Sequence, residues 1–152
     1  MRSFSAYVPT DIRFGVGMVK ELHNMRMPGR KALLVISNGK SIRANGYLDT
    51  VEGELRQAGV ETVLFDRVEA NPLKSTVMAG AACSRDNGCD FVVALGGGSV
   101  MDAAKVIAFM AVNPGDVWDY IAGGTGKAQP RKAAPLSLVC VTTTAGTGSE
   151  AD

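Results

Sequence analysis

The sequence predicts an α/β fold, a doubly wound and mostly parallel sheet with helices on both faces. Its short apolar runs are uninterrupted, as in strands that other elements cover on both faces. Between these runs lie longer stretches in which apolar residues recur at helical spacing. Strands and helices that alternate in this way along one chain are typical of the doubly wound class.

The expected strands are the apolar runs themselves. None of the runs approaches the roughly 20 apolar residues that a membrane-spanning helix requires. The start of the chain leads into charged residues without the apolar core of a secretory signal. We therefore expect a soluble, cytoplasmic protein with no membrane partner. The four expected strands are Ala32–Ile36, Thr62–Phe65, Phe91–Leu95 and Leu136–Val141.

Three amphipathic helices are expected, at about residues 48–58, 73–82 and 100–111, because apolar residues recur there every three or four positions. Each is followed by a glycine, the residue that commonly ends a helix. These glycines are Gly59, Gly88 and Gly115. Residues 123–135 are rich in Gly, Lys, Pro and Gln, which predicts an exposed loop.

The first thirty residues fall outside this alternation. Ser5–Val8 and Ile12–Phe14 carry β-branched and aromatic residues, and we expect them to be short antiparallel strands. Gly15-x-Gly17 is then expected to open a helix that continues to about Met25.

The composition excludes several classes of protein. The chain has 152 residues, a formal net charge of +1 and 46% hydrophobic residues, which suits one domain over residues 1–152. This charge gives no electrostatic reason to expect a nucleic-acid partner. Cys83, Cys89 and Cys140 form no C-x-x-C pair, so we expect neither a zinc site nor a thioredoxin-type motif. We interpret all three cysteines as structural residues in a reducing compartment.

The most informative segment joins the strand expected at 91–95 to the next helix. Gly96, Gly97 and Gly98 stand there, followed by Ser99. Glycines let a ligand approach the backbone closely, and the amides at a helix start attract anions, so we expect this turn to bind a pyrophosphate. A structural interpretation is also open, in which the turn is merely tight and Ser99 and Asp102 form a capping box.

A second candidate loop, residues 141–150, follows the last expected strand and carries several hydroxyl groups and two glycines. Hydroxyl groups can donate to phosphate or ribose oxygens, although an ordinary turn of small residues has the same composition. Loops at the carboxyl ends of parallel strands form the ligand crevice of doubly wound sheets. The two loops are therefore expected to open on the same side.

Four motifs occur in the order and spacing of a known family. They are Phe14-Gly15-x-Gly17, Asn71-Pro72, Gly96-Gly-Gly-Ser-x-x-Asp102 and Thr143-Thr144-Ala-Gly-Thr-Gly-Ser-Glu150. Over essentially its whole length the chain resembles the amino-terminal, Rossmann-like domain of the iron-containing (group III) alcohol dehydrogenases. The resemblance implies that the chain binds NAD or NADP. It assigns the pyrophosphate to Gly97, Gly98 and Ser99, beside Gly96 and Asp102, and the rest of the cleft to Asn71, Thr143, Thr144 and Thr147.

The resemblance also implies what this chain lacks. In the family, a helical carboxyl-terminal domain holds iron or another divalent metal with one aspartate and three histidines. The chain has a single histidine, His23, which we interpret as a surface or packing residue. We therefore expect no metal site and no catalytic residue here, and the helical domain is absent from these residues. The intact enzyme is expected to interconvert small alcohols and aldehydes or ketones by hydride transfer, and to be a homo-oligomer.

The loop after the first expected strand bears on the choice of cofactor. A site selects NAD by placing a carboxylate on the ribose 2′-hydroxyl, whereas the 2′-phosphate of NADP needs donors or a cation. Asn38, Gly39, Lys40 and Ser41 stand in this loop, and no acid follows until Asp49. The loop is similar to those of NADP-dependent relatives, so we favour NADP over NAD, with Lys40 facing the phosphate. A solvated Lys40 is the alternative interpretation.

Two other functions fit the same residues. One is a stand-alone nucleotide- or phosphate-binding module without catalysis. The other is a fragment of an enzyme that resembles glycerol dehydrogenase, which shares the fold and the triple-glycine turn. Within the resemblance, the segment 143–150 favours the alcohol dehydrogenase branch.

Overall fold

Parallel strands form the central sheet in the order β2-β1-β3-β4. The computed structural model describes residues 7–146 and 148–151, and its strands are β1 (Lys31–Ser37), β2 (Glu61–Val68), β3 (Phe91–Gly96) and β4 (Ser137–Thr142). Every pairing in the sheet is parallel. The expected strands are confirmed to within a few residues, and the fold is the expected Rossmann-like α/β class.

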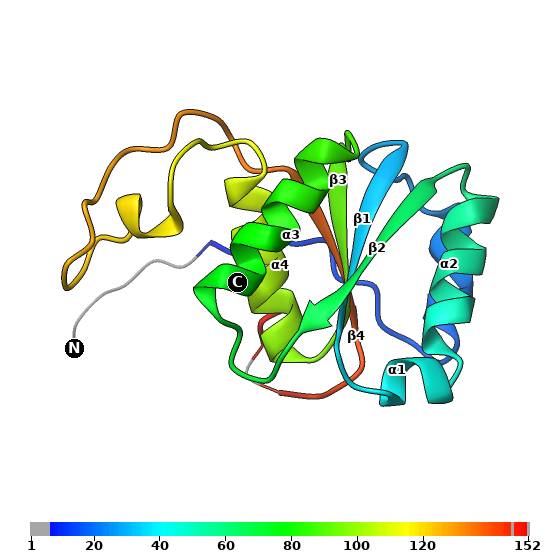
Figure 1. Ribbon diagram of the computed structural model, residues 1–152. Helices are drawn as coiled ribbons and strands as arrows, with labels where there is room; N and C mark the ends of the chain where they lie inside the picture. The colour runs from blue at the N-terminus through cyan, green and yellow to red at the C-terminus, as the bar shows by residue number, and fades with distance from the viewer. Residues whose placement is uncertain (1–6, 147, 152) are drawn as a thin grey trace, which may run out of the picture.

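Helices cover both faces of the sheet, as Figure 1 shows. The helices α3 (Lys74–Asp86) and α4 (Gly98–Met110) lie on one face. The other face carries η1 (Met18–Asn24), α1 (Ser41–Ala44) and α2 (Tyr47–Gln57), of which η1 is a 3-10 helix. The three expected helices correspond to α2, α3 and α4, whereas the single turn of α1 was not expected.

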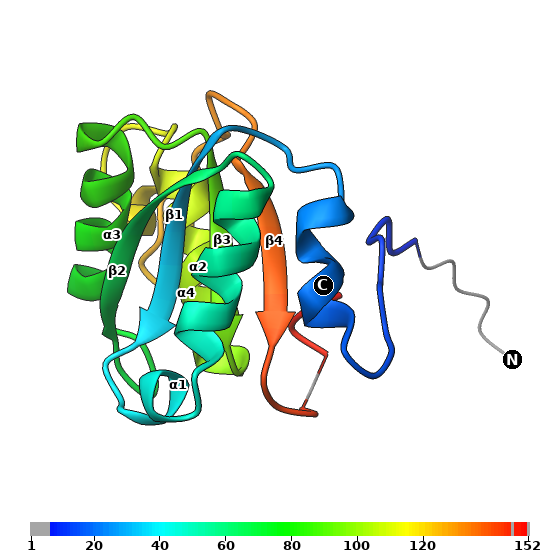
Figure 2. The same ribbon diagram turned by 90° about the vertical axis from the view of Figure 1, so that its right-hand side faces the viewer.

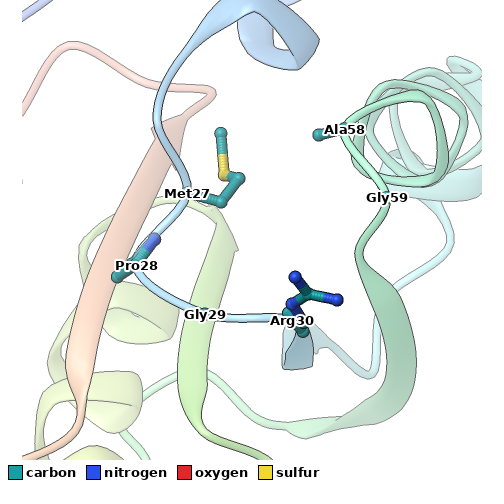
Figure 3. A pocket seen from close by; sticks show the side chains of 6 residues that line it. All are labelled: Met27, Pro28, Gly29, Arg30, Ala58 and Gly59. Atoms are coloured by element: carbon teal, nitrogen blue, oxygen red, sulfur yellow. The ribbon is translucent and has the colours of Figure 1, made fainter.

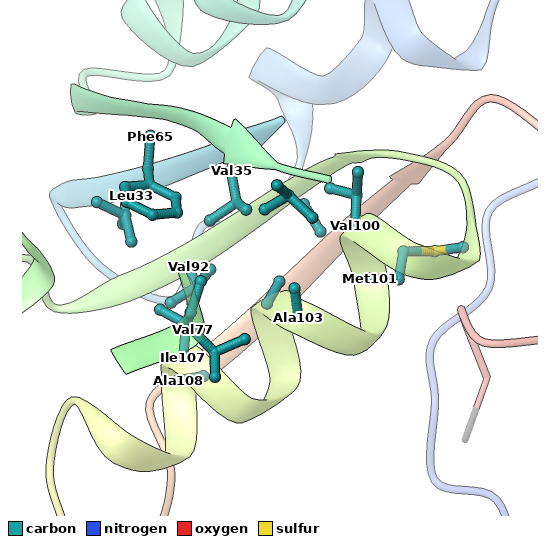
Figure 4. Close-up of a cluster of buried hydrophobic side chains, with 13 residues drawn as sticks. Leu33, Val35, Phe65, Val77, Val92, Val100, Met101, Ala103, Ile107 and Ala108 are labelled. Carbon is teal, nitrogen blue, oxygen red and sulfur yellow. The ribbon is translucent and has the colours of Figure 1, made fainter. Parts of the chain in front are cut away.

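Strand side chains alternate between two apolar cores because successive residues of a strand point to opposite faces. Leu33 and Val35 of β1 pack toward α4, where Ile107 lies in the same cluster (Figure 4). Leu34 and Ile36 belong to the core on the α2 side. All four of these strand residues are fully buried, so β1 is covered on both faces as its sequence predicted.

The prediction of antiparallel strands near the amino terminus is wrong for the residues that the structure describes. Residues 7–14 form neither helix nor strand, and Ser5 and Ala6 lie outside the described part. A strand needs a neighbour to accept its backbone hydrogen bonds. Within the described chain no strand lies beside this segment, and the side chain of Phe14 is 98% exposed. The helix expected after Gly17 is present as η1.

The loop expected at residues 123–135 is confirmed as an exposed excursion that follows a short 3-10 helix, η2 (Val117–Asp119), and leads to β4 (Figure 1). The three cysteines are free, partly buried and packed against the core on the α3–α4 side. Burial raises the pKa of the Cys89 and Cys140 thiols. Among the described residues, no helix is long and apolar enough to cross a membrane.

Candidate functional site

The loops that follow the parallel strands all leave the sheet on one side, which we call its carboxyl end (Figure 2). Most of the candidate residues lie at this end, because they follow β1, β2, β3 or β4 in the chain. Asp102 lies one turn into α4, and Thr147 lies outside the described residues. The topology therefore places four loops at the end of the sheet where doubly wound folds bind their ligands.

The turn from β3 into α4 has no side-chain cap. Gly97 is the N-cap residue with an extended backbone, and the first intrahelical hydrogen bonds run from the amides of Val100 and Met101 to the Gly97 carbonyl, at 3.0 and 3.1 Å. Ser99 lies at the second helical position, too far along to be an N-cap. The alternative in which Ser99 and Asp102 form a capping box is therefore wrong.

Two backbone amides at this turn are left available to a ligand. Within the described chain, the amides of Gly98 and Ser99 have no hydrogen-bond partner. They open a helix of 13 residues, whose aligned peptide dipoles place about half a positive charge at this end. An anion with several acceptor oxygens suits this arrangement.

A pocket of about 270 Å³ lies where this turn meets the loop after β4. A Cβ atom built on Gly97 would come within 3.0 Å of the Thr144 Oγ1 atom, and one on Gly98 within 3.5 Å of the Ser149 Oγ atom. The absence of side chains at these glycines thus lets the two loops approach each other closely. The pocket is lined by Gly98, Ser99, Met101, Thr144, Gly146, Ser149 and Glu150.

The pocket includes residues that sequence reasoning did not assign to the site. Ser149 and Glu150 belong to the recognised motif of the second loop, so following that motif to its end would have found them. Met101 gave no signal, because its apolar side chain also fits an ordinary core position. Of the expected residues that the structure describes, Gly98, Ser99 and Thr144 line the pocket and the others do not. A side chain on Gly96 would collide with Val100, and exposed Asp102 lies 3.7 Å from the Lys105 ammonium.

The loop after β4 is held in place by backbone and hydroxyl hydrogen bonds. The Thr143 amide donates to the Gly96 carbonyl at 3.1 Å, which continues the pairing of β3 with β4. The Thr142 hydroxyl donates to the Thr144 carbonyl at 2.8 Å. These contacts orient Thr144 beside the glycine turn before any ligand is present.

The loop after β1 is tied to β2. The Asn38 amide donates to the Val68 carbonyl at 2.8 Å, and Arg43 of α1 forms an ion pair with Asp66 of β2 at 2.5 Å. Lys40 is the N-cap residue of α1. Its side chain is exposed, as are Asn38, Gly39 and Ser41.

The loop after β2 is shaped by Glu69. One oxygen of its carboxylate, Oε1, accepts from the Thr76 hydroxyl at 2.8 Å and from the Leu73 amide at 3.2 Å. The backbone amide of Glu69 and the Thr76 hydroxyl lower the pKa of this carboxyl group. Asn71 lies in the loop that these hydrogen bonds close. Its side chain is exposed, and its backbone takes the left-handed conformation, with φ of 57°. Glu69 thus holds Asn71 at the carboxyl end of the sheet.

The described residues do not fit a metal ion. They contain no group of three or more His, Cys, Asp or Glu side chains that could bind one. His23 instead hydrogen-bonds through Nδ1 to Glu54 Oε2 at 2.6 Å, which fastens η1 to α2. This is the packing role that the sequence indicated for the histidine.

A second pocket, of about 490 Å³, lies at the opposite, amino end of the sheet (Figure 3). The side chains of Met27, Ala58 and Arg30 surround its opening. Behind it, the Asp90 carboxylate accepts from the amides of Arg30 and Lys31, each at 2.9 Å. The amides of Arg30, Ala58 and Gly59, which line this pocket, thus already have partners.

Comparison with known proteins agrees with this geometry. The family model for iron-containing alcohol dehydrogenases matches residues 9–152. This chain belongs to the iron-containing alcohol dehydrogenase family. Its sequence is 40% identical over 150 residues to the probable NADH-dependent butanol dehydrogenase 1 of Bacillus subtilis (strain 168), covering 99% of this chain and 38% of that protein. It is 35% identical over 143 residues to the NADPH-dependent butanol dehydrogenase of Clostridium saccharobutylicum, covering 94% of this chain and 36% of the relative.

Solved structures of alcohol dehydrogenases share the fold. NADH-dependent butanol dehydrogenase A from Thermotoga maritima superimposes with a TM-score of 0.85 at 32% identity, over 97% of this chain and 36% of that one. An archaeal halo-thermophilic alcohol dehydrogenase from a Red Sea brine pool superimposes with a TM-score of 0.88 at 38% identity, over 97% of this chain and 38% of that one. The chain thus spans well under half the length of the relatives it matches.

Proposed function

We propose that residues 1–152 form the dinucleotide-binding domain of a nicotinamide-dependent alcohol dehydrogenase. The observation that supports this most strongly is the uncapped start of α4, whose amides at Gly98 and Ser99 open on the pocket shared with the loop after β4. A pyrophosphate offers acceptor oxygens and negative charge at the spacing of such a turn.

Residues in the pocket and near it have distinct roles in this proposal. The amides of Gly98 and Ser99 donate to the pyrophosphate, and each such charge-assisted hydrogen bond contributes roughly 1.5–3 kcal/mol. The hydroxyls of Thr144 and Ser149 add neutral donors from the facing loop. Gly97 lies beside the pocket and lets Thr144 approach the turn closely. We assign Asn71, in the loop that Glu69 closes, to the adenosine side of the cofactor.

The bound nicotinamide supplies the hydride chemistry, and this chain supplies the binding and orientation. The relatives are named for butanol and for other small alcohols, so we assign the substrate to the class of small alcohols and their aldehydes. No step is assigned to a metal, since the described residues do not fit one. By itself the chain is expected to bind nucleotide weakly and to turn over negligibly. Self-association into a homo-oligomer stays a prediction.

The finer choice of cofactor is NADP rather than NAD. Residues 38–41 present amide, hydroxyl and ammonium groups at the end of β1 and no carboxylate. Exchanging Lys40 for Asp should move the preference toward NAD. Equal affinity of the variant for both cofactors would contradict a role for Lys40 at the 2′-phosphate.

Direct titration tests the proposed function. NADP and NAD are each added to the purified chain, and binding is followed by calorimetry and by the rise in the unfolding temperature, which any ligand specific to the folded state produces. We expect saturable binding of both, tighter for NADP. If neither dinucleotide binds or protects the chain at millimolar concentrations, the proposed function is wrong.

A further inference from the structure

The ion pair between Arg43 and Asp66 lies beside the loop that the proposed function assigns to the 2′-phosphate. Asp66 is on β2 and Arg43 is in α1, and their nearest nitrogen and oxygen atoms are 2.5 Å apart. The two side chains are 45% and 46% exposed. Because both reach solvent, the pair is weak and its partners can be exchanged for others.

Arg43 and Lys40 share one helical turn. Lys40 is the N-cap residue and has right-handed helical backbone angles, with φ of −89° and ψ of −18°. The Ala44 amide donates to its carbonyl at 2.9 Å, which closes the turn. Residues three apart on such a turn lie on the same side of it. The only cations between Ser37 and Asp49 are therefore neighbours in space as well as in sequence.

Asp66 is the carboxylate that neutralises one of these two cations. The segment 38–46 contains no acid of its own, so the negative charge comes from the next strand. A guanidinium forms paired hydrogen bonds with a phosphate as readily as with a carboxylate. A 2′-phosphate carries more negative charge than the Asp66 carboxylate. It can therefore replace Asp66, whose side chain is partly exposed, as the partner of Arg43.

We propose that Arg43 is a specificity-determining residue for the 2′-phosphate of NADP, and that Asp66 competes with the phosphate for its guanidinium. This inference rests on the proposed function, because it assumes that the adenosine end of a dinucleotide lies over residues 38–43. Asp66 then limits the preference for NADP, since an unliganded chain keeps Arg43 paired. NAD has only a hydroxyl at this position and leaves the ion pair unchanged.

The test compares dissociation constants of NADP and NAD for the full chain and two variants at low ionic strength, where exposed charges are least screened. Arg43→Gln should weaken NADP binding about tenfold, the size of one charge-assisted hydrogen bond, and leave NAD within about twofold. Asp66→Asn should tighten NADP about threefold and leave NAD unchanged, because it removes only the competitor's charge. Arg43→Lys should restore part of the NADP affinity.

A matched control removes the same charge from the other end of the same strand. Glu61 of β2 pairs with Lys31 at 2.8 Å at the amino end of the sheet, so Glu61→Gln should leave the NADP/NAD ratio unchanged. The inference is overturned if Arg43→Gln changes the affinities for NADP and NAD equally, or changes neither of them. It is also overturned if Asp66→Asn weakens the binding of both cofactors, which is the result expected if Asp66 only anchors the loop. A wild-type chain that binds neither dinucleotide would overturn the proposed function itself.

Discussion

The two ends of the sheet carry pockets that differ in size and in the state of their backbone groups. The larger pocket, about 490 Å³, is at the amino end (Figure 3), and the smaller, about 270 Å³, is at the carboxyl end. At the amino end, Asp90 accepts hydrogen bonds from the amides of Arg30 and Lys31. At the carboxyl end, the described residues leave the first amides of α4 without partners. Free amides at the start of a long helix, where the helix dipole attracts an anion, identify the binding site better than the volume does.

The direction of the helices reinforces this difference. In a doubly wound fold each helix begins at the carboxyl end of the sheet and finishes at the amino end. The helix α2 finishes at Gln57, and the next residues, Ala58 and Gly59, line the larger pocket. Helix carboxyl termini carry partial negative charge, which disfavours an anion there. The same backbone thus makes one end suited to a pyrophosphate and the other unsuited to it.

The largest effect is expected from a bulky side chain at Gly97, beside the smaller pocket and against Thr144. Gly97→Leu should reduce dinucleotide affinity at least tenfold and abolish thermal protection, because even a Cβ atom would come within 3.0 Å of Thr144 Oγ1. The backbone of Gly97, with φ of −90°, is open to any residue, so the fold should be retained. Calorimetric titration of the variant with NADP measures the loss.

The control for this variant lies in the larger pocket. Arg30→Gln removes the cation that lines it and should leave dinucleotide affinity within about twofold, since exposed charges outside a binding site contribute little. A variant Arg30→Gln that lost NADP binding, with Gly97→Leu still competent, would reverse the assignment of the two ends.

The sheet could be predicted because its strands are covered on both faces. Runs such as 32–36 and 91–95 are apolar at every position, and a pattern of that kind has few alternatives in a chain of this length. Residues 7–14 were mispredicted because their β-branched and aromatic side chains have strand propensity, which expresses itself only where a neighbouring strand is available. The sequence contains no signal for that neighbour.

The site could be predicted in part. Glycines 97 and 98 were found from their place between a buried strand and a helix, and Thr144 was found from the family motif. The contacts that hold the loops could not be predicted from the sequence. The hydrogen bond of Thr76 to Glu69 and the ion pair of Arg43 with Asp66 each join different elements, so they depend on tertiary packing. The sequence could not exclude the alternative capping box of Ser99, because that motif depends on where the helix starts, a boundary that the pattern locates only to within a few residues.

The amino end of the sheet gives the next largest effect, on stability rather than binding. Asp90→Ala removes two hydrogen bonds to backbone amides and should lower the free energy of unfolding by about 1–2 kcal/mol. Burial raises the pKa of Asp90, but the amides of Arg30, Lys31 and Asp90 itself outweigh this and lower it. Stability from this carboxylate is thus present above its ordinary pKa and lost as the pH falls through the lower folded value.

Urea unfolding at neutral pH measures the loss, and Asp86→Ala is the matched control. Asp86 is an exposed aspartate at the end of α3, so its removal should change stability by less than about 0.5 kcal/mol. Dinucleotide affinity should be unaffected in both variants. If Asp90→Ala made NADP binding less favourable by as much as it lowered the free energy of unfolding, the amino end of the sheet would also contribute to binding, and our assignment of binding to the carboxyl end alone would be wrong.

The smallest effect is expected at a site on neither end, the contact between η1 and α2. The hydrogen bond with Glu54 raises the pKa of His23, and the hydrogen bond with His23 lowers the pKa of Glu54. The raised His23 pKa adds stability below its ordinary value of 6.5, which is lost as the pH rises through the folded value. The lowered Glu54 pKa adds stability above its ordinary value of 4.5, which is lost as the pH falls through the folded value.

Both contributions coincide between pH 4.5 and 6.5, so the pair should stabilise the fold most within that window. Glu54→Gln keeps the size of the side chain and removes its charge. The difference in unfolding free energy between wild type and this variant should peak inside the window and shrink on both sides. A difference that stays constant from pH 4 to pH 8 would mean that the contact is held by packing alone. Since His23 and Glu54 touch neither pocket, NADP affinity should follow the same pH dependence in both proteins.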